Sequence, residues 1–249
     1  MAAGGMRTGP ALARVRLAPR QPLPDATAMA ATWNRIGGLL GLLCTGLGIA
    51  PAAALAVWKV ECGALEFIRG TPVLRFEAHV FFNHWGKDHE ELFDSHFQFG
   101  GRNGIAGARW ERHRFRQNEN NDWRRLHGDQ STEYQALALA ESLAGGETAS
   151  LCASFGGPQI MGFNHAVIGY DTALAMRQAF ARTERWQVCG FFDFCVAKSI
   201  IRALQTHDWM TFASTYNGPG NAAAYGAQIA EAYAEACLLL DREHDATPS

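Results

Sequence analysis

The feature that most limits how this chain can fold is an uncharged run of residues, 36–58. A run of this length is a candidate for a membrane-spanning helix. It is interrupted by five glycines and a proline. In particular, Gly48-Ile49-Ala50-Pro51 is typical of a place where one helix ends and another begins. We therefore expect two packed helices, at residues 28–47 and 51–61, in place of a single membrane span.

The second of these helices ends on a carboxylate, Glu61. Pro51 suits the first helical position, and the alanines that follow are strong helix formers. Glu61 would lie in the last turn beside Val57 and Trp58. The negative end of the helix dipole and apolar neighbours both raise the pKa of a carboxyl group. A carboxylic acid that stays protonated near neutral pH can act as a general acid. The alternative is a solvated glutamate at a helix end.

The overall composition fits one globular domain with a sizeable core and flexible ends. The chain has 249 residues, of which 48% are hydrophobic and 18% are charged, and its net charge of −2 gives no general reason to expect a nucleic-acid partner. Its six cysteines contain no CxxC pair. We therefore interpret them as buried thiols of a protein made in the reducing cytoplasm. Because no Cys/His pair has the spacing of zinc ligands, we expect neither a metal nor a cofactor.

The chain is expected to be mainly α (α+β). Residues 1–27 carry four arginines and one acid without apolar periodicity, which predicts a disordered extension. It could be a transit peptide or lie upstream of a start at Met29. Residues 28–240 would form the folded domain and 241–249 a flexible tail. Residues 71–77 are typical of a strand, and 86–130 predict a long, mostly irregular β-type insertion after the second helix. Further helices are expected at 132–143, 148–154, 171–182, 183–205, 208–214 and 221–240.

The insertion contains a run rich in arginine and aromatic residues. Residues 102–125 hold seven arginines and three acids, with Trp110, Phe115 and Trp123 among them. Such a mixture could stack on nucleic-acid bases or on sugar rings. An amphipathic surface loop is the simpler interpretation.

Four motifs appear in the chain in a specific order: Val60–Ala64 (VECGA), Arg75–Phe81 (RFEAHVF), Pro158–His165 (PQIMGFNH) and Tyr216–Gly220 (YNGPG). In this order they resemble the N-acetylmuramidase endolysins of phages and prophages, within the lysozyme-like superfamily. The resemblance extends from about residue 32 to residue 238. The sequence departs from the family pattern at Cys62, Ala64 and the Gly157-Pro158 pair.

The resemblance implies a lysozyme-like helical domain that cleaves peptidoglycan. Glu61 would be the general acid, and Gln159 would lie at the floor of a cleft. Tyr216 would fix or stabilise the acid, and Asn217 would shape the loop or contact substrate. Each has a structural alternative. Gln159 could satisfy backbone groups, Tyr216 could be a core aromatic residue, and Asn217 could belong to an ordinary turn.

Hydrolysis also requires a nucleophile or a base that activates water. Glu77 is the first candidate for this second carboxylate, and an ion pair with Arg75 is its structural alternative. Glu66 and Asp171 are weaker candidates. His79 and His165 lie far apart in the sequence, so we expect them to pack or to form hydrogen bonds and not to bind a metal.

The leading function is therefore hydrolysis of the β-1,4 bond between N-acetylmuramic acid and N-acetylglucosamine. The alternatives are a lytic transglycosylase that leaves anhydro-muramic ends, a non-catalytic glycan-binding protein, and a nucleic-acid binder that uses residues 102–125. We expect a monomer made in the cytoplasm that acts on glycan strands of the cell wall, in the periplasm, after release. A holin-type partner is one candidate for the export route.

Overall fold

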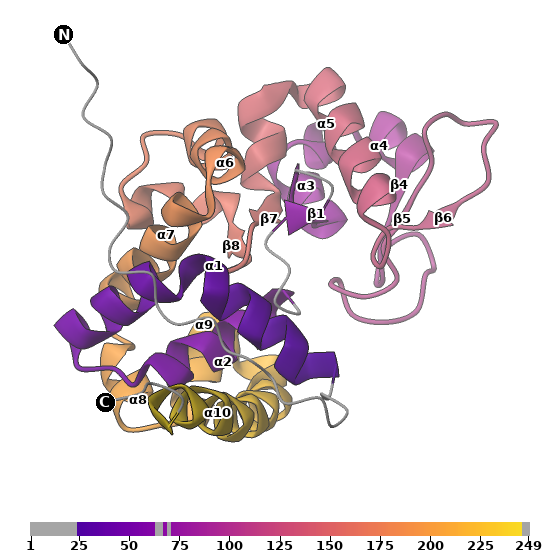
Figure 1. The fold of residues 1–249 in the computed structure, drawn as a ribbon. Coiled ribbons are helices and arrows are strands. Elements are labelled where there is room, and N and C mark those ends of the chain that lie inside the picture. Colours follow the sequence, from indigo (N-terminus) through magenta and orange to yellow (C-terminus); the bar gives the residue numbers. More distant parts are fainter. Residues whose placement is uncertain (1–23, 63–66, 69–70, 246–249) are drawn as a thin grey trace, which may run out of the picture. The chain divides into compact units, whose positions relative to one another are not determined.

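The computed structural model describes residues 24–62, 67–68 and 71–245. The chain divides into two compact units, each of which is described by itself (Figure 1). The helical unit consists of Met1–Leu65 and Phe194–Ser249, and the mixed unit consists of Glu66–Asp193. The predicted disorder of residues 1–27 falls mostly outside the described residues, although helix α1 already begins at Pro24.

The helical unit is built around α2 (Pro51–Cys62), which packs against α1 (Pro24–Leu47) and α10 (Ala222–Asp245). α8 (Ile201–Gln205) and α9 (Trp209–Tyr216) complete the unit, and α9 also packs on α10 (Figure 1). Every residue from Ala52 to Trp58 is buried. A helix that is apolar on all sides must be enclosed by other helices, so the composition of α2 explains its central position.

The mixed unit contains a three-stranded antiparallel sheet in the order β3-β7-β8. β3 (Leu74–Phe76) pairs with β7 (Ala153–Phe155), which continues through a tight turn into β8 (Ile160–Met161). The long helix α5 (Gln130–Leu151) packs on β3. The buried carboxylate of Glu133 on α5 accepts a hydrogen bond from the backbone N–H of Phe76, with an N–O distance of 2.7 Å.

A second small sheet in the mixed unit is made of β4 (Phe97–Gln98), β5 (Arg114–Phe115) and β6 (Arg124–Arg125). It adjoins α3 (Ala78–His84), the 3-10 helix η1 (Gly86–Asp88) and α4 (Glu90–His96). Their core is a cluster of buried phenylalanine rings: Phe76, Phe81, Phe93, Phe97 and Phe115. The insertion at residues 86–130 is thus more ordered than the sequence predicted, because these rings give it a core of its own.

The remaining elements connect, along the chain, those already described. β1 (Phe67–Ile68) pairs with β2 (Thr71–Pro72). The 3-10 helix η2 (Gly162–Ile168) and α6 (Ala173–Arg182) follow β8, and α7 (Glu184–Ala197) runs to the boundary of the units. The 3-10 helix η3 (Pro219–Asn221) leads into α10 in the helical unit.

The two helices predicted within residues 28–61 are confirmed, with a break at Gly48, whose φ is 65°. In the described part of the chain, no helix is both long and apolar enough to cross a membrane. The predicted break at Gly145 is also confirmed, since its φ of 81° interrupts α5. The predicted helix 183–205 is instead two helices, α7 and α8, because the chain turns at Ser199, where φ is 57°.

Two helix starts were predicted at the wrong residue. α5 begins at Gln130 and not at the predicted residue 132, because the carboxylate of Asp129 caps it by accepting hydrogen bonds from the backbone N–H groups of Ser131 and Thr132. α6 begins at Ala173 and not at the predicted residue 171, because the side chain of Thr172 caps it. Both residues lie close to the expected position, and several good capping residues occur together in each case.

Gly162, the first residue of η2, provides a test of the packing between η2 and α5. A Cβ atom at Gly162 would lie 1.8 Å from the backbone oxygen of Ser150. Gly162→Ala should therefore lower the free energy of unfolding by about 2 kcal/mol or more, measured by urea denaturation. The matched control is Gly146→Ala in the same unit, where a Cβ atom would meet only Leu174 and Glu141 side-chain atoms at ordinary contact distances. Equal stability of the two variants would contradict the packing described here.

Candidate active site

Glu61 lies in the last turn of α2, as the sequence predicted, and its side chain is half-buried. Asn217 is the C-cap residue of α9, and its Nδ2 donates a hydrogen bond to Glu61 Oε1 at 2.8 Å. The two residues belong to the same unit although they are far apart in the sequence, because α2 and α9 both pack on α10. The structure therefore brings together two of the residues that the motifs singled out.

The surroundings of Glu61 favour its protonated form. Burial raises the pKa of Glu61 to about 7, and the hydrogen bond from Asn217, which lowers the pKa, offsets only part of this effect. The preceding residues Val57 and Trp58 are fully buried, so the carboxyl group adjoins an apolar helix. A carboxyl group with a pKa near 7 can exist in both protonation states at neutral pH and can donate a proton to a substrate.

The loop that carries Asn217 is shaped by α9 and by Gly218. Asp208 caps the start of α9 by accepting a hydrogen bond from the backbone N–H of Thr211. Tyr216 in the last turn is half-buried, with its ring 5.1 Å from that of Phe212 and nearly parallel to it. Gly218 has a φ of 92°, which turns the chain toward η3. Tyr216 thus anchors the end of the helix from which Asn217 extends.

Gln159 occupies the turn between β7 and β8, where its own φ is 49°. Its side-chain oxygen accepts a hydrogen bond from Ser154 Oγ, and its Nε2 donates to the backbone oxygen of Gly156 at 2.8 Å. The predicted alternative, in which Gln159 satisfies backbone groups, is therefore present in the structure. The turn is held further by Gln187, which accepts a hydrogen bond from the backbone N–H of Gly157.

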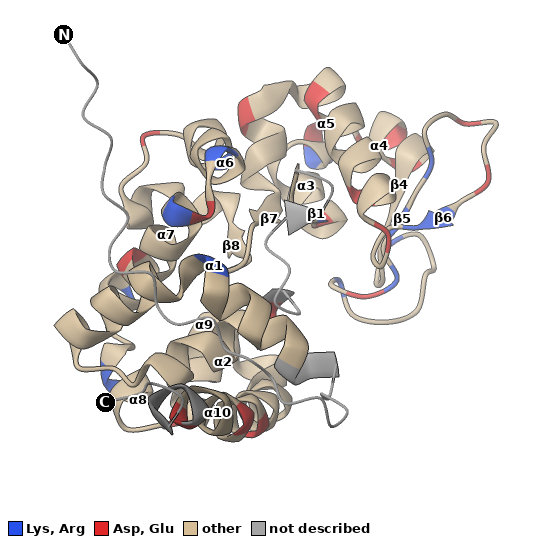
Figure 2. Cartoon of the chain, in the orientation of Figure 1, with Lys and Arg blue, Asp and Glu red and all other residues tan. Residues whose placement is uncertain are grey.

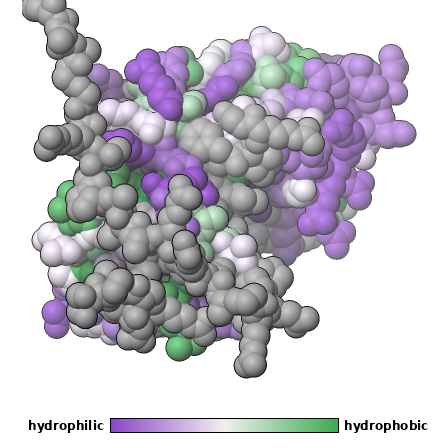
Figure 3. All heavy atoms as spheres, in the orientation of Figure 1, coloured by the Kyte–Doolittle hydropathy of each residue, from purple (hydrophilic) through white to green (hydrophobic). Residues whose placement is uncertain are grey.

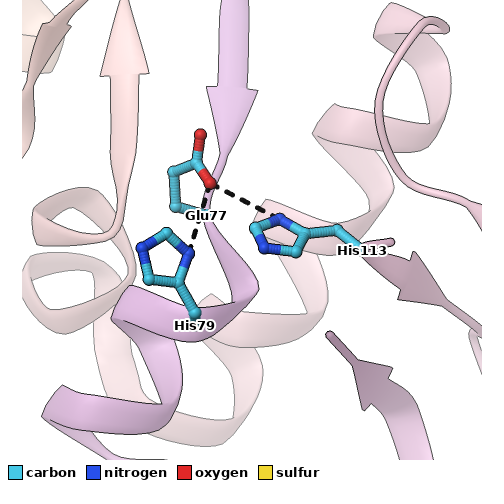
Figure 4. Close-up of side chains that lie close together, drawn as sticks. All are labelled: Glu77, His79 and His113. Atoms are coloured by element: carbon cyan, nitrogen blue, oxygen red, sulfur yellow. Dashed lines mark ion pairs between the residues drawn. The ribbon is translucent and has the colours of Figure 1, made fainter. Parts of the chain in front are cut away.

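Glu77 lies directly after β3, at the opposite end of that strand from the turn of Gln159. Arg75 Nε donates to Glu77 Oε1 at 2.6 Å, so the ion pair expected as the structural alternative is present. Glu77 Oε2 lies 3.4 Å from His79 Nδ1 and 3.4 Å from His113 Nδ1. Figure 4 shows the three side chains pointing toward one another from the end of β3, the first turn of α3 and the segment before β5.

The electrostatics at Glu77 are opposite to those at Glu61. Burial raises the pKa of Glu77, but the contact with His79 and the positive charge of Arg75 outweigh it and lower the pKa to about 2. Burial also lowers the pKa of His113 to about 4, although the nearby Glu77 carboxylate opposes this. Glu77 is therefore an anion and His113 a neutral imidazole at physiological pH. Together with His79, Glu77 and His113 form a group of described side chains that could hold a metal ion.

Sequence reasoning missed His113 and the residues behind it. His127 Nε2 lies 2.8 Å from His113 Nδ1, and His127 Nδ1 lies 3.0 Å from Glu133 Oε1. One signal was available in the segment 112–115, Arg-His-Arg-Phe. There His113 and Phe115 are buried while the two arginines are exposed, which is the alternation of a strand. That pattern predicts an inward-facing histidine.

A cavity of about 470 Å³ in the mixed unit is bordered by charged and aromatic side chains. Its lining comprises Arg75, Trp110, Glu111, Arg112, His113, Arg114, Arg125 and His127. Figure 2 shows the basic residues of β5 and β6, and Figure 3 shows hydrophilic side chains over the same segment. Arg114 and Arg125 are directly opposite in the β5–β6 pair. Like charges in this position repel, so this face of the mixed unit favours an anionic ligand or solvent.

Comparison with solved structures identifies the fold. The structure is similar to the crystal structure of Burkholderia AP3 phage endolysin, with a TM-score of 0.57 and 24% sequence identity. The match covers 90% of this chain and 74% of the endolysin chain. The fold is thus mainly α with small sheets, as the sequence predicted, and is similar to that of this phage endolysin.

The family of the chain follows from comparing its sequence with models of known protein families. Residues 50–236 match the model of the N-acetylmuramidase family, so the chain belongs to that family. The matched region contains Glu61, Glu77, Gln159, Tyr216 and Asn217. No curated protein shows significant similarity to the chain. Membership of this family supports peptidoglycan hydrolysis as the general activity.

The raised pKa of Glu61 predicts a pH-dependent cost to stability. Glu61 binds its proton more tightly in the folded state than in the unfolded chain, whose ordinary value is 4.5. Stability should therefore fall as the pH rises from 4.5 to 7. Glu61→Gln removes this effect, so at pH 8 it should increase the free energy of unfolding by about 1 to 3 kcal/mol, and at pH 4 the difference should vanish.

Urea denaturation at the two pH values measures this effect. The matched control is Glu235→Gln in the same unit, which removes a partly exposed ion pair with Lys59. Because such pairs contribute little, the control should not gain stability at pH 8. A Glu61→Gln variant no more stable than the wild type at pH 8 would contradict the raised pKa.

Proposed function

We propose that this protein hydrolyses the β-1,4 bond between N-acetylmuramic acid and N-acetylglucosamine in peptidoglycan, with Glu61 as the general acid. The observation that carries the proposal is a half-buried carboxyl group with a pKa of about 7, hydrogen-bonded to Asn217 at the end of a buried helix. Glycosidases that use a carboxylic acid need a group of this kind. The N-acetylmuramidase family match and the fold of a phage endolysin support the same chemistry.

The proposed proton transfer follows from the two oxygens of Glu61. Oε1 accepts the hydrogen bond from Asn217 Nδ2, so the proton resides on Oε2. In the reaction this proton would pass to the glycosidic oxygen as the bond from that oxygen to the anomeric carbon breaks. The electron pair of the broken bond stays on the departing oxygen, which leaves as a neutral hydroxyl. Glu61 becomes a carboxylate, which the hydrogen bond from Asn217 then stabilises.

Asn217 has a second feature suited to substrate binding. Its Oδ1 is buried and has no hydrogen-bond partner among the described residues. An unsatisfied buried acceptor costs free energy unless a partner arrives. A hydroxyl or acetamido N–H of the glycan would satisfy it, and we propose that Asn217 contacts the sugar while it orients the acid.

Tyr216 and Gln159 have structural roles in this proposal. Tyr216 holds the end of α9 through its stacking on Phe212, and this fixes the position from which Asn217 reaches Glu61. Gln159 is committed to Ser154 and the backbone of its own turn. We therefore propose that it shapes the β7–β8 turn and does not take part in proton transfer.

Glu77 is less suited to activate water than its low pKa alone would indicate. A base or nucleophile must be ionised, and Glu77 is. However, Oε1 accepts from Arg75, and Oε2 is buried beside two imidazole nitrogens. Water or a sugar carbon would have to displace these contacts. We therefore assign Glu77 a binding role, which is developed in the next subsection.

Mass spectrometry of purified peptidoglycan after incubation with the protein tests the proposed function. The wild type should release fragments with reducing muramic-acid ends. Glu61→Gln should slow this release about 10²- to 10⁴-fold, because a general acid contributes that much. Glu235→Gln should remain fully active. Near-ultraviolet circular dichroism of each variant checks the fold.

Other product patterns would contradict the proposal in distinct ways. Anhydro-muramic ends would identify a lytic transglycosylase, and free N-acetylglucosamine ends would place the cut at the other glycosidic bond. Peptidoglycan binding without cleavage by the wild type would identify a glycan-binding protein. Undiminished activity of Glu61→Gln would remove Glu61 from the mechanism.

The hydrogen bond from Asn217 predicts a shift in the pH profile. Activity that depends on protonated Glu61 should fall as the pH rises through the pKa of this group. Asn217 lowers that pKa, so Asn217→Ala should move the alkaline limb upward by about one pH unit. The control is Asn221→Ala, an exposed residue in the following turn. An alkaline limb that stays in place or moves downward in Asn217→Ala would contradict the role of this hydrogen bond.

A further inference from the structure

We propose that Glu77, His79 and His113 form a binding site for one divalent transition-metal ion, with zinc as the best fit. The ligand atoms are Glu77 Oε2, His79 Nδ1 and His113 Nδ1, which all lie within 4.8 Å of one another. The site belongs to the mixed unit, and the inference does not depend on the proposed glycosidase activity. Neither the motifs nor the spacing of cysteines and histidines predicted it.

Two of the three separations between ligand atoms match those around a tetrahedral ion, and the third is at most 4.8 Å. Ligands at about 2.0 to 2.2 Å from zinc are separated from one another by about 3.3 to 3.6 Å. Glu77 Oε2 lies 3.4 Å from each of the two histidine nitrogens. These distances are too long for well-formed hydrogen bonds. A cation placed between the three atoms would bring them all within bonding distance with little movement of the chain.

Two of the three atoms make no hydrogen bond in the described structure. Glu77 Oε2 and His79 Nδ1 are buried and make no hydrogen bond to any described residue. Buried polar atoms almost always have a partner, and each exception requires a reason such as a bound ion. Two unsatisfied atoms that face the same point are explained together by a single ion.

The surroundings of the ligands hold them in a state suited to bind metal. His113 Nε2 donates to the backbone oxygen of Arg109 at 2.9 Å, which places the proton of the neutral ring on Nε2 and leaves an electron pair, and no proton, on Nδ1. Metal-binding histidines commonly make this kind of contact with their second nitrogen. Arg75 holds the other oxygen of Glu77, so the carboxylate is fixed with Oε2 toward the histidines.

The donor set and the local charge select the kind of ion. Two imidazoles and one carboxylate suit zinc and related transition metals, whereas calcium and magnesium prefer oxygen ligands. Three protein ligands leave a fourth position open. His113 and Arg75 also border the 470 Å³ cavity, which provides a route from solvent. The arginines around that cavity favour an anion or hydroxide at the open position.

Metal binding would replace one hydrogen bond in the present arrangement. His113 Nδ1 currently accepts from His127 Nε2 at 2.8 Å, and an ion on His113 Nδ1 would occupy the same electron pair. His127 must then turn away, and its Nδ1 would leave Glu133 Oε1 as well. This exchange is local, because it requires the rotation of one imidazole ring.

Equilibrium dialysis with zinc, followed by elemental analysis, tests the proposal on chelator-treated full-length protein. The wild type should bind one tight equivalent. His79→Asn and His113→Asn should each weaken that affinity by at least about tenfold. His165→Asn is the matched control, since His165 lies in the same unit and its Nδ1 is hydrogen-bonded to the backbone oxygen of Tyr170. It should bind like the wild type. Near-ultraviolet circular dichroism without metal shows whether each variant folds.

Cobalt substitution shows which atoms hold the ion. The visible spectrum of bound Co²⁺ should be that of a four-coordinate ion with nitrogen and oxygen ligands. Glu77→Gln removes the charge of a ligand and should also lose the spectrum. It keeps the proposal testable if either histidine variant fails to fold. Thiolate charge-transfer bands would place the ion on cysteines and overturn the proposal. So would less than one zinc per wild-type chain, or wild-type affinity in the folded histidine variants.

Discussion

Desolvation of the Glu61 carboxyl group is the interaction on which the functional interpretation depends. The central helix α2 is buried along Ala52–Trp58, and its apolar surface is what packs α1 and α10 around it. The same burial that stabilises the helical unit penalises a charge at the end of α2. Asn217 offers a single neutral hydrogen bond in return, which relieves only part of that cost. A carboxyl group at this position is therefore held near the midpoint of its titration at neutral pH.

In the mixed unit, buried carboxylates have charged groups and several hydrogen-bonding groups as partners. Glu77 has the cation of Arg75 and two imidazoles beside it and is ionised. Glu133 has the backbone N–H of Phe76 and the ring of His127 as partners. These two carboxylates tie β3, α5 and the segment before β5 together. One chain thus contains one carboxyl group whose pKa is raised by burial and others that are held by positive or hydrogen-bonding groups, and the difference lies in the neighbours and not in the residue type.

Much of the helical unit could be predicted from local sequence. Pro51 and Gly48 mark the break between α1 and α2, and Asp208 caps α9 as expected. These signals act within one turn of helix, so a single sequence is sufficient to detect them. The motifs also pointed to Glu61 and Asn217, which the structure brings into direct contact. Their pairing could be expected only from the family resemblance, because contacts between distant residues leave no local pattern.

The histidine cluster and the order of residues 86–130 could not be predicted in the same way. The insertion is ordered by contacts among phenylalanines from β3, α3, α4 and the second sheet, and those contacts span long stretches of sequence. His113, in the segment before β5, meets Glu77 and His79 only through tertiary contacts between distant parts of the sequence. Ser199 illustrates a local failure. An uninterrupted helical pattern predicted a helix through it, but the chain adopts a left-handed conformation there with φ of 57°, which few residues other than glycine favour.

The protonation state of Glu61 is best measured by carbon-13 NMR titration of the side-chain carboxyl groups, with Glu61→Gln identifying the resonance. We expect one carboxyl signal, absent from the variant, to titrate with a pKa of about 7. Its midpoint should move upward in Asn217→Ala. A Glu61 resonance that titrates near the ordinary value of 4.5 would show that the carboxyl group is solvated, and Glu61 would then not be the proton donor proposed here.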